Sequence, residues 1–345
     1  MATQTFHFTN GSSHLSLSPD HVLPQEQRPN LTQTPLLSSI PVIDLSEQPS
    51  ASVVDKVSKA CEEYGFFQII NHGVPRELCD GVLAVVAAFF ELPPEEKARF
   101  LATTDRTQQV RLFNYYVKGD GENKVSMWSE CFGHLWHPLD QTLHLLPENP
   151  PRYREIIAEY AKEIGVLMKR LLRLISEGLG LQQDCLEKKI GDSPMCRAQG
   201  NYYPPCPNPE LTLGLNVHTD MSALTIVRQS EGVTGLQVIK DGHWVAVEPI
   251  PDAFVVNVGD QIQVLSNGRY KSVHHRAVTN ETRKRVSMAT FYTPGKDTVI
   301  GPIRDLIDEQ HTPLYREYYF SEFLEEFFKQ EGARRMVTEI FELKS

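Results

Sequence analysis

The sequence predicts a mixed α and β fold in which helices surround an antiparallel sandwich or barrel of strands. Two observations predict it. Short apolar runs separated by turn residues follow one another closely from residue 196 to residue 300, a pattern typical of sandwiches and barrels. Before them, apolar residues recur at helical spacing from Ile156 to Ile175 and end at Gly178, which predicts one long amphipathic support helix packed on a sheet.

The elements are expected in four segments along the 345 residues. At roughly 150 residues per domain, this length allows about two domains or one large one. Polar composition predicts a loosely held start, and an aromatic face from Tyr318 to Phe327 predicts a helix near the end. The segments are 1–38, a flexible N-terminal arm; 39–195, a helical and strand region; 196–300, the β core; and 301–345, a C-terminal helical segment.

In the second and third segments, individual strands can be assigned from apolar runs. Asn267-Gly268 is a strong signal for a hairpin between two of them. The expected strands are Ile40–Leu45, Phe66–Asn71, Leu224–Val227, Leu236–Ile239, Trp244–Val247, Phe254–Asn257, Tyr270–Val278 and Val286–Tyr292.

Charge and composition exclude several classes of function. The chain has 34 Lys and Arg against 44 Asp and Glu, a formal net charge of −10, which does not suit binding to nucleic acid or to an anionic membrane. No apolar run approaches the ~20 residues that span a bilayer, and the first residues lack a signal-peptide pattern. Six cysteines without a CxxC pair predict reduced thiols. We therefore expect a cytoplasmic, monomeric protein that acts on a small molecule.

Two histidines and an aspartate in the β core predict a metal site. In an extended segment His218 and Asp220 point to the same face, and His275 follows in another expected strand. Two imidazoles and one carboxylate form the facial triad of non-haem Fe(II) oxygenases, which leaves adjacent coordination positions open. A lone His-x-Asp pair is common, and a histidine on a strand is more often a polar residue satisfied by hydrogen bonds. The combination favours the metal site.

Arg285 and Ser287 extend this pattern. They lie two residues apart in an expected strand and so share a face. A guanidinium can hold a carboxylate through two parallel hydrogen bonds, and a hydroxyl adds a third; the far end of a 2-oxo dicarboxylic acid needs such a partner. By itself, Arg285 beside Arg283 and Lys284 would be a solvated cluster of charges.

Taken in order, these motifs resemble the plant Fe(II)- and 2-oxoglutarate-dependent dioxygenases. The resemblance extends over nearly the whole chain after residue 40, and the ordered set is far more specific than any one motif. The matching segments are Ile40–Leu45, Gly65–Val74, Asn201–Pro207, His218–Asp220, Asn267–Asn280 and Arg285–Ser287.

The resemblance implies a distorted double-stranded β-helix, or jelly roll, with iron bound inside one end. It implies that His218, Asp220 and His275 are the iron ligands, with His275 preferred to His274 because the family ligand directly precedes an arginine. The implied co-substrates are 2-oxoglutarate and O₂, with ascorbate as reductant, and the products are succinate, CO₂ and an oxidised substrate. The expected 2-oxoglutarate-binding residues are Arg285, Ser287, Tyr203 and Asn201.

The substrate is less closely specified. Arg111-Leu112 and Trp128 resemble the hyoscyamine 6-hydroxylase-like and downy-mildew-resistance-type branches, which act in specialised metabolism, but Ser129-Glu130 departs from their pattern. An aromatic lining would suit a flat aromatic or alkaloid substrate, to be hydroxylated, desaturated or demethylated. Ordinary packing is the alternative for each candidate contact. These candidates are Phe291, Phe113, Tyr115, Trp128, Phe132 and His134.

Three alternatives remain. An aminocyclopropane-carboxylate-oxidase-type enzyme would have the same triad and the Arg-x-Ser motif but would use ascorbate instead of 2-oxoglutarate. A non-catalytic jelly-roll protein could bind a small molecule without oxidising it, although such a relic would be expected to lose a ligand. A zinc hydrolase is the weakest alternative, because no HExxH motif is present.

Overall fold

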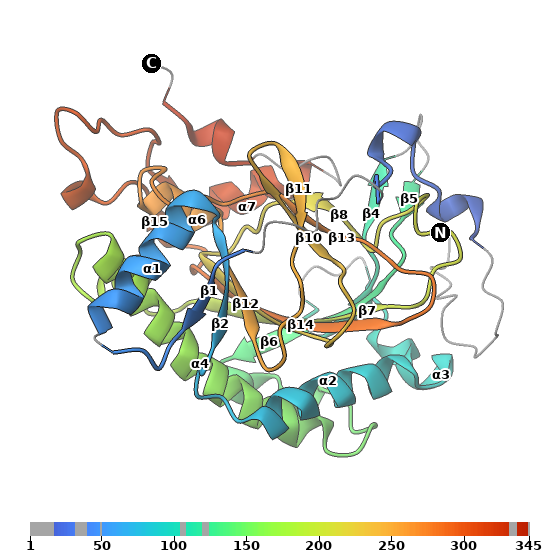
Figure 1. The fold of residues 1–345 in the computed structure, drawn as a ribbon. Helices are drawn as coiled ribbons and strands as arrows, with labels where there is room; N and C mark the ends of the chain where they lie inside the picture. The colour runs from blue at the N-terminus through green and yellow to red at the C-terminus, as the bar shows by residue number, and fades with distance from the viewer. Residues whose placement is uncertain are drawn as a thin grey trace.

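Two sheets form the centre of the computed structural model, which describes residues 17–31, 40–48, 50–103, 108–118, 124–330 and 337–343. The large sheet has the strand order β1-β2-β12-β9-β14-β7-β6-β3, and the small sheet has the order β11-β10-β13-β8. Within these sheets β1 pairs with β2 in parallel, and the other neighbours are antiparallel. This arrangement, with its surrounding helices (Figure 1), confirms the expected mixed fold with a jelly-roll core.

Most of the expected strands begin and end within two residues of the observed ones. The large sheet contains β1 (Val42–Asp44), β2 (Phe66–Ile70), β3 (Arg111–Phe113), β6 (Glu130–His137), β7 (Met195–Tyr203), β9 (Leu224–Gln229), β12 (Phe254–Val258) and β14 (Arg285–Thr293). The small sheet contains β8 (Leu215–His218), β10 (Leu236–Lys240), β11 (His243–Ala246) and β13 (His275–Ala277). Two shorter pairs are β4 (Tyr116–Lys118) with β5 (Lys124–Ser126), and β15 (Val299–Ile300) with β16 (Tyr318–Tyr319).

Helices cover one face of the large sheet. The predicted support helix is α4, whose buried residues, Ile157, Ile164 and Leu171 among them, follow the expected apolar face. Figure 1 shows α4 and α2 side by side beneath the strands. No helix in the described ranges is long and apolar enough to cross a membrane. The helices are α1 (Ser50–Glu63), α2 (Arg76–Phe90), α3 (Pro94–Lys97), α4 (Tyr153–Gly178), α5 (Cys185–Ile190), α6 (Asp260–Leu265) and α7 (Phe320–Lys329).

The predicted hairpin at Asn267-Gly268 is wrong. Both residues have positive φ, 52° and 76°, as a tight turn requires, but the turn ends α6: the Gly268 N–H donates to the Gln263 carbonyl, a common helix stop. The strand expected over Tyr270–Val278 is correspondingly short. The Lys271 N–H donates to Cys61, outside any strand ladder, so pairing begins only at His275.

The two end segments differ from their expected forms. The described part of the N-terminal arm, residues 17–31, contains short 3₁₀ helices at Pro19–His21 and Gln25–Gln27. Leu23 within it is fully buried, and its N–H donates to the Leu211 carbonyl, so this part is held against the β core. Residues 1–16 and 32–38 of the predicted arm lie outside the described residues. Near the C-terminus, β16 immediately precedes α7.

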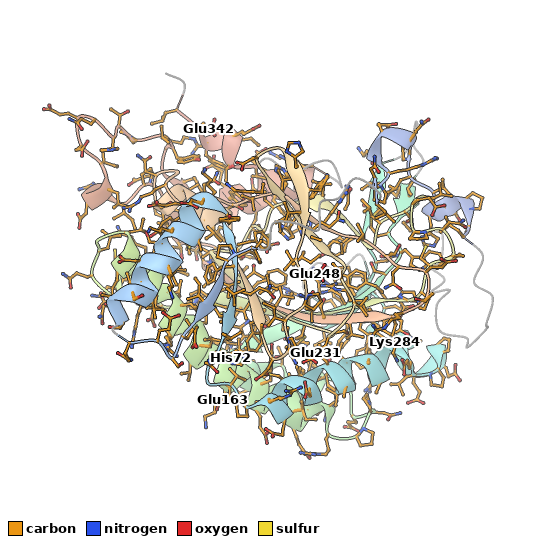
Figure 2. The ribbon with its side chains drawn as sticks, in the orientation of Figure 1. His72, Glu163, Glu231, Glu248, Lys284 and Glu342 are labelled. Atoms are coloured by element: carbon orange, nitrogen blue, oxygen red, sulfur yellow. The ribbon has the colours of Figure 1, made fainter. Side chains whose placement is uncertain are left out.

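A buried ion pair supports the outer face of the large sheet. Lys284, labelled in Figure 2, forms an exposed ion pair with Glu91, and such surface pairs contribute little. Lys97 and Glu130, in contrast, are 2% and 0% exposed, and Lys97 Nζ lies 3.5 Å from Glu130 Oε2. Burial raises the pKa of Glu130 to about 7, although Lys97 opposes the shift. Glu130 therefore depends on Lys97 to remain ionised.

We expect Lys97→Met to destabilise the fold by about 3 kcal/mol at pH 8, because the remaining buried carboxylate has no counter-charge. In the variant, the pKa of Glu130 should rise further above its ordinary value of 4.5. At pH values between 4.5 and this raised pKa, the folded state binds more protons than the unfolded state, so the stability of the variant falls as pH rises. Urea unfolding at pH 6 and pH 8 measures this, with Lys284→Met as the surface control. An equal loss of stability at both pH values would contradict the role of Glu130.

Candidate functional site

A cavity of about 260 Å³ lies between the two sheets. Residues two apart on a strand face the same side, and β7 and β14 each turn one such row of side chains into the cavity. The small sheet contributes residues from β8, β10 and β13. The inward rows are Arg197, Gln199, Asn201 and Tyr203 on β7, and Arg285, Ser287, Ala289 and Phe291 on β14.

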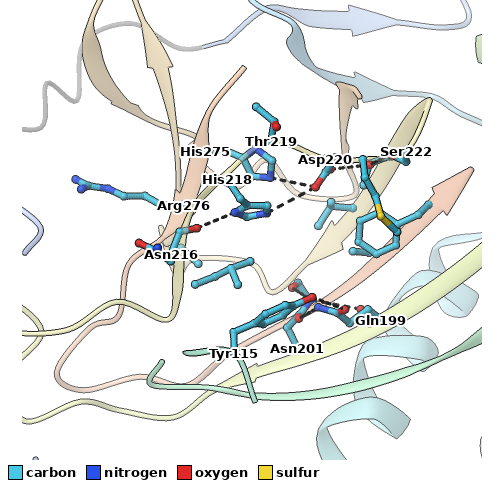
Figure 3. A pocket seen from close by; sticks show the side chains of 18 of the residues that line it. Tyr115, Gln199, Asn201, Asn216, His218, Thr219, Asp220, Ser222, His275 and Arg276 are labelled. Carbon is cyan, nitrogen blue, oxygen red and sulfur yellow. Dashed lines mark hydrogen bonds and ion pairs between the residues drawn. The ribbon is translucent and has the colours of Figure 1, made fainter. Parts of the chain in front are cut away.

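The three predicted metal ligands meet at one side of this cavity. Pairing of β13 with β8 places His275 directly opposite His218, and their ring centroids are 4.1 Å apart. Asp220 Oδ1 lies 3.6 Å from Nε2 of each histidine. Figure 3 shows the two imidazoles and the carboxylate converging, opposite the group formed by Tyr115, Gln199 and Asn201. The nitrogen and oxygen atoms are therefore placed to bind one ion.

Hydrogen bonds fix the orientation of both imidazoles. His218 Nδ1 lies 2.7 Å from the Asn216 carbonyl oxygen, and His275 Nδ1 lies 3.2 Å from that of Val273. A carbonyl can only accept, so each Nδ1 carries the proton and each Nε2 keeps its lone pair for a metal. Metal-binding histidines usually have this arrangement. The donor set of two neutral imidazoles and one carboxylate fits Fe(II).

Asp220 is held in its ionised form with Oδ1 facing the two histidines. Its Oδ2 accepts hydrogen bonds of 2.7 Å from Thr225 Oγ1 and from Asn257 Nδ2. Burial by itself would raise the pKa of Asp220, but His275, His218 and these two donors outweigh it, and the pKa is lower than its ordinary value. Sequence reasoning missed Thr225 and Asn257; the available signal was a polar residue inside an apolar strand.

Thr225→Val should weaken Fe(II) binding by roughly tenfold, because loss of a hydrogen bond that supports a ligand typically costs 10- to 100-fold in metal affinity. The substitution keeps the shape of the side chain. Thr234→Val is a matched control, since Thr234 Oγ1 makes a similar 2.8 Å bond to Glu248 at the surface. Equilibrium dialysis under anaerobic conditions measures both affinities, and equal affinities would show that Thr225 does not support the metal site.

The predicted 2-oxoglutarate residues form a second group in the same cavity. Across the β14–β7 ladder, Arg285 lies opposite Tyr203, and Ser287 lies opposite Asn201. Arg285 Nη2 donates to Gln229 Oε1 at 2.8 Å, while its buried Nε has no hydrogen-bond partner and no carboxylate pairs with it among the described residues. A buried guanidinium without a counter-charge is a suitable partner for a ligand carboxylate.

Two glycines allow this group to pack closely. A Cβ atom on Gly214 would lie 2.5 Å from Tyr203 Cδ1, and one on Gly235 would lie 2.6 Å from Arg285 Cδ. Arg285 Cζ is consequently 5.0 Å from the Tyr203 ring centroid. Burial raises the pKa of Tyr203 to about 12 despite the nearby arginine, so its hydroxyl remains protonated and can donate to a bound ligand.

Three of the six candidate substrate residues line the cavity: Phe113, Tyr115 and Phe291. The other three, Trp128, Phe132 and His134, are not among the residues that line it. Phe132 and His134 lie on the outward face of β6, one residue on either side of the cavity-lining Gly133. Phe132 packs against Phe89, with ring centroids 4.2 Å apart.

His134 and Trp128 are buried by other contacts. His134 Nδ1 lies 2.8 Å from the Leu135 carbonyl oxygen, and burial lowers the pKa of His134 to about 4. Trp128 Nε1 donates to the Pro204 carbonyl at 3.2 Å, and the His21 ring packs edge-on against the indole. Trp128 therefore holds the segment after β7 and the N-terminal residues in place.

Polar residues that were not predicted as ligand contacts also line the cavity. Arg197 and Gln199 belong to the same row on β7 as Asn201, and Arg111 reaches the cavity from β3. The signal was an alternation of polar residues before Tyr203, which becomes visible once β7 is known to begin at Met195.

Comparisons with known proteins agree with this geometry. Residues 196–294 match the 2OG-Fe(II) oxygenase superfamily, and residues 40–153 match the N-terminal region described as "non-haem dioxygenase in morphine synthesis". Downy mildew resistance 6 of Arabidopsis thaliana is 40% identical over 326 residues, which cover 93% of this chain and 94% of that protein. Hyoscyamine 6-dioxygenase of Hyoscyamus niger is 38% identical over 328 residues, with coverage of 92% and 93%.

A solved structure shows the same likeness along nearly the whole chain. The crystal structure of JOX2 in complex with 2OG, Fe and JA superposes with a TM-score of 0.85 and 34% identity, covering 97% of this chain and 96% of that one. The match therefore includes the helices and both sheets, and the chain belongs to the 2OG-Fe(II) oxygenase superfamily.

Proposed function

We propose that this protein is an Fe(II)- and 2-oxoglutarate-dependent oxygenase that oxidises a small aromatic or alkaloid plant metabolite, by hydroxylation, desaturation or demethylation. The observation that carries the proposal is the pairing of two groups in one cavity. Three ligand atoms, Nε2 of each histidine and Oδ1 of Asp220, converge where they could bind Fe(II), and a buried guanidinium has no carboxylate partner among the described residues. Together they match the two ends of a bound 2-oxoglutarate.

The roles of the residues follow from their contacts. His218 and His275 would hold the metal through Nε2, and Asp220 would hold it through Oδ1. Arg285 and Ser287 would bind the distal carboxylate of 2-oxoglutarate, with Gln229 orienting the guanidinium. Asn201 donates to Ser287 Oγ at 3.3 Å, which leaves the Ser287 hydroxyl proton available for the ligand.

When bound, Fe(II) supplies the redox chemistry by which 2-oxoglutarate, O₂ and a substrate C–H group yield succinate, CO₂ and a hydroxylated product. The protein contributes position and environment. Phe113, Tyr115 and Phe291 surround the remaining space, which excludes water and suits a flat aromatic body. Ala289 lies between Ser287 and Phe291 on the same strand face and leaves room for the reacting part of the substrate.

The proposal is tested by adding Fe(II) and then 2-oxoglutarate to the purified metal-free protein without oxygen. The expected result is the weak visible charge-transfer band of the Fe(II)–2-oxoglutarate chelate, followed by succinate release when O₂ and substrate are supplied. Binding of Fe(II) without the band would favour the ascorbate-using oxidase. A band without succinate release would favour the binding protein, and failure to bind Fe(II) would refute the proposal.

Compartment and assembly belong to the same proposal. All six cysteines have free thiols, which supports a reducing compartment such as the cytoplasm. We propose a monomer that uses ascorbate as reductant. Size-exclusion chromatography with light scattering measures the oligomeric state, and the dependence of turnover number on added ascorbate tests its use as reductant.

A further inference from the structure

Two arginines face the part of the cavity that the 2-oxoglutarate group does not use. Arg197 belongs to the inward row of β7, and Arg111 enters from β3 through the pairing of Arg111 with Gly133 on β6. Gly133 has no side chain to separate them from the cavity: a Cβ there would lie 3.8 Å from Arg197 Nη2 and 3.3 Å from Phe113 Cε1. Burial and the positive charge of Arg111 lower the pKa of Arg197 to about 10.

Neither arginine has a counter-charge in the described structure. No carboxylate in the described ranges forms an ion pair with either one, and the buried atoms Arg197 Nη2 and Arg111 Nε have no hydrogen-bond partner. Asp220 is the acidic side chain among the cavity-lining residues, and the metal site uses it. Both side chains are half-buried, and guanidinium nitrogen atoms that are buried without a hydrogen-bond partner are costly, so their presence at a cavity points to an anionic ligand.

The charges of the proposed complex with Fe(II) and 2-oxoglutarate also favour an anionic substrate. Fe(II) and Arg285 together balance Asp220 and the two carboxylates of 2-oxoglutarate. Arg111, Arg197 and Arg276 then remain as an excess of positive charge along the cavity. Arg276 Nε donates to Gln237, and its guanidinium stacks on Trp244, whereas Arg111 and Arg197 have unpartnered nitrogen atoms beside the space left for substrate. This excess would repel a cationic alkaloid and attract an anion.

We propose that the substrate is an aromatic carboxylate whose carboxylate group is bound by Arg197 and Arg111. The inference rests on the proposed function and narrows its substrate class. The planar guanidinium of an arginine matches the two oxygens of a carboxylate, and Phe113, Tyr115 and Phe291 would enclose the ring.

The strand ladder sets the expected length of this substrate. The pairs Ser287–Asn201, Ala289–Gln199 and Phe291–Arg197 follow one another along β14 and β7. Arg197 is four residues from Asn201, or about 13 Å along the strand. The carboxylate would therefore lie at one end of the cavity, with the aromatic body reaching back over Ala289 towards the metal.

Calorimetric titration of the anaerobic protein, loaded with Fe(II) and saturating 2-oxoglutarate, tests the inference. The probes are benzoate, trans-cinnamate and 2-naphthoate, their methyl esters, and benzylamine as a cation. We expect at least one acid to bind about tenfold or more tightly than its ester, as hydrogen bonds between charged groups imply, and benzylamine not to bind. Arg197→Met should lower the affinity for that acid by about tenfold or more, while the affinity for its ester stays within about twofold.

Controls separate this inference from the proposed function. Arg197→Lys keeps the charge and should lose less affinity than Arg197→Met, and Arg152→Met removes an exposed arginine outside the cavity and should change nothing. The charge-transfer band, recorded for every variant, reports the intact metal and 2-oxoglutarate sites. Its absence in the unmodified protein would count against the proposed function. With the band present, the inference is overturned if no acid binds, if esters bind as well as acids, or if Arg197→Met weakens both equally.

Discussion

His275→Ala should abolish Fe(II) binding and activity, whereas His274→Ala should leave most of both. The two residues are neighbours in sequence, but His275 Nε2 lies 3.6 Å from Asp220 Oδ1, and His274 does not line the cavity. Loss of one of three protein ligands should weaken Fe(II) binding beyond the roughly 10- to 100-fold typical of losing a supporting hydrogen bond. His218→Ala and Asp220→Ala should behave like His275→Ala.

This comparison is sharp because each variant removes one imidazole from the same segment. Metal content after anaerobic dialysis, together with succinate release, measures the effect, and circular dichroism checks that each variant folds. Loss of iron in His274→Ala with retention in His275→Ala would exchange the two assignments. Retention of iron in all four variants would refute the triad as the metal site.

The sequence could predict the triad because its geometry is mostly local. His218 and Asp220 share a face through the two-residue period of extended chain, and the resemblance selected His275. The pairing of His275 with His218 across β13 and β8 is a long-range feature, which no local pattern could supply. The same holds for Thr225 and Asn257, which reach Asp220 from two other strands.

The differences between expectation and structure have physical causes of the same kind. The strand containing Phe132 and His134 was not recognised, so the face on which each lies could not be assigned, and both face the helices instead of the cavity. Asn267-Gly268 has backbone angles that suit either a hairpin or a helix end, and only the preceding α6 decides between them. Burial of Leu23 depends on contact with Leu211, far along the chain.

Arg285→Ala should weaken 2-oxoglutarate binding by roughly 30-fold or more while leaving Fe(II) affinity unchanged. Removing one partner of a buried, hydrogen-bonded charge pair costs about 2–5 kcal/mol, and each 1.4 kcal/mol is a factor of ten in affinity. Arg285 is 4% exposed, so water cannot readily replace its guanidinium. Gln229, which accepts from Arg285 Nη2, would lose its charged partner as well.

A shorter 2-oxo acid makes the test specific for the distal carboxylate. 2-Oxobutyrate keeps the 2-oxo acid group that chelates the metal but has no second carboxylate for Arg285. In the unmodified protein 2-oxoglutarate should bind much more tightly than 2-oxobutyrate, and in Arg285→Ala this preference should disappear because only 2-oxoglutarate loses a contact. Arg285→Lys retains the charge without the paired hydrogen bonds and should fall between them. An undiminished preference in Arg285→Ala, measured by titrating the charge-transfer band, would place the distal carboxylate elsewhere in the cavity. Arg197 and Arg111, whose buried nitrogen atoms have no hydrogen-bond partner, could then bind it.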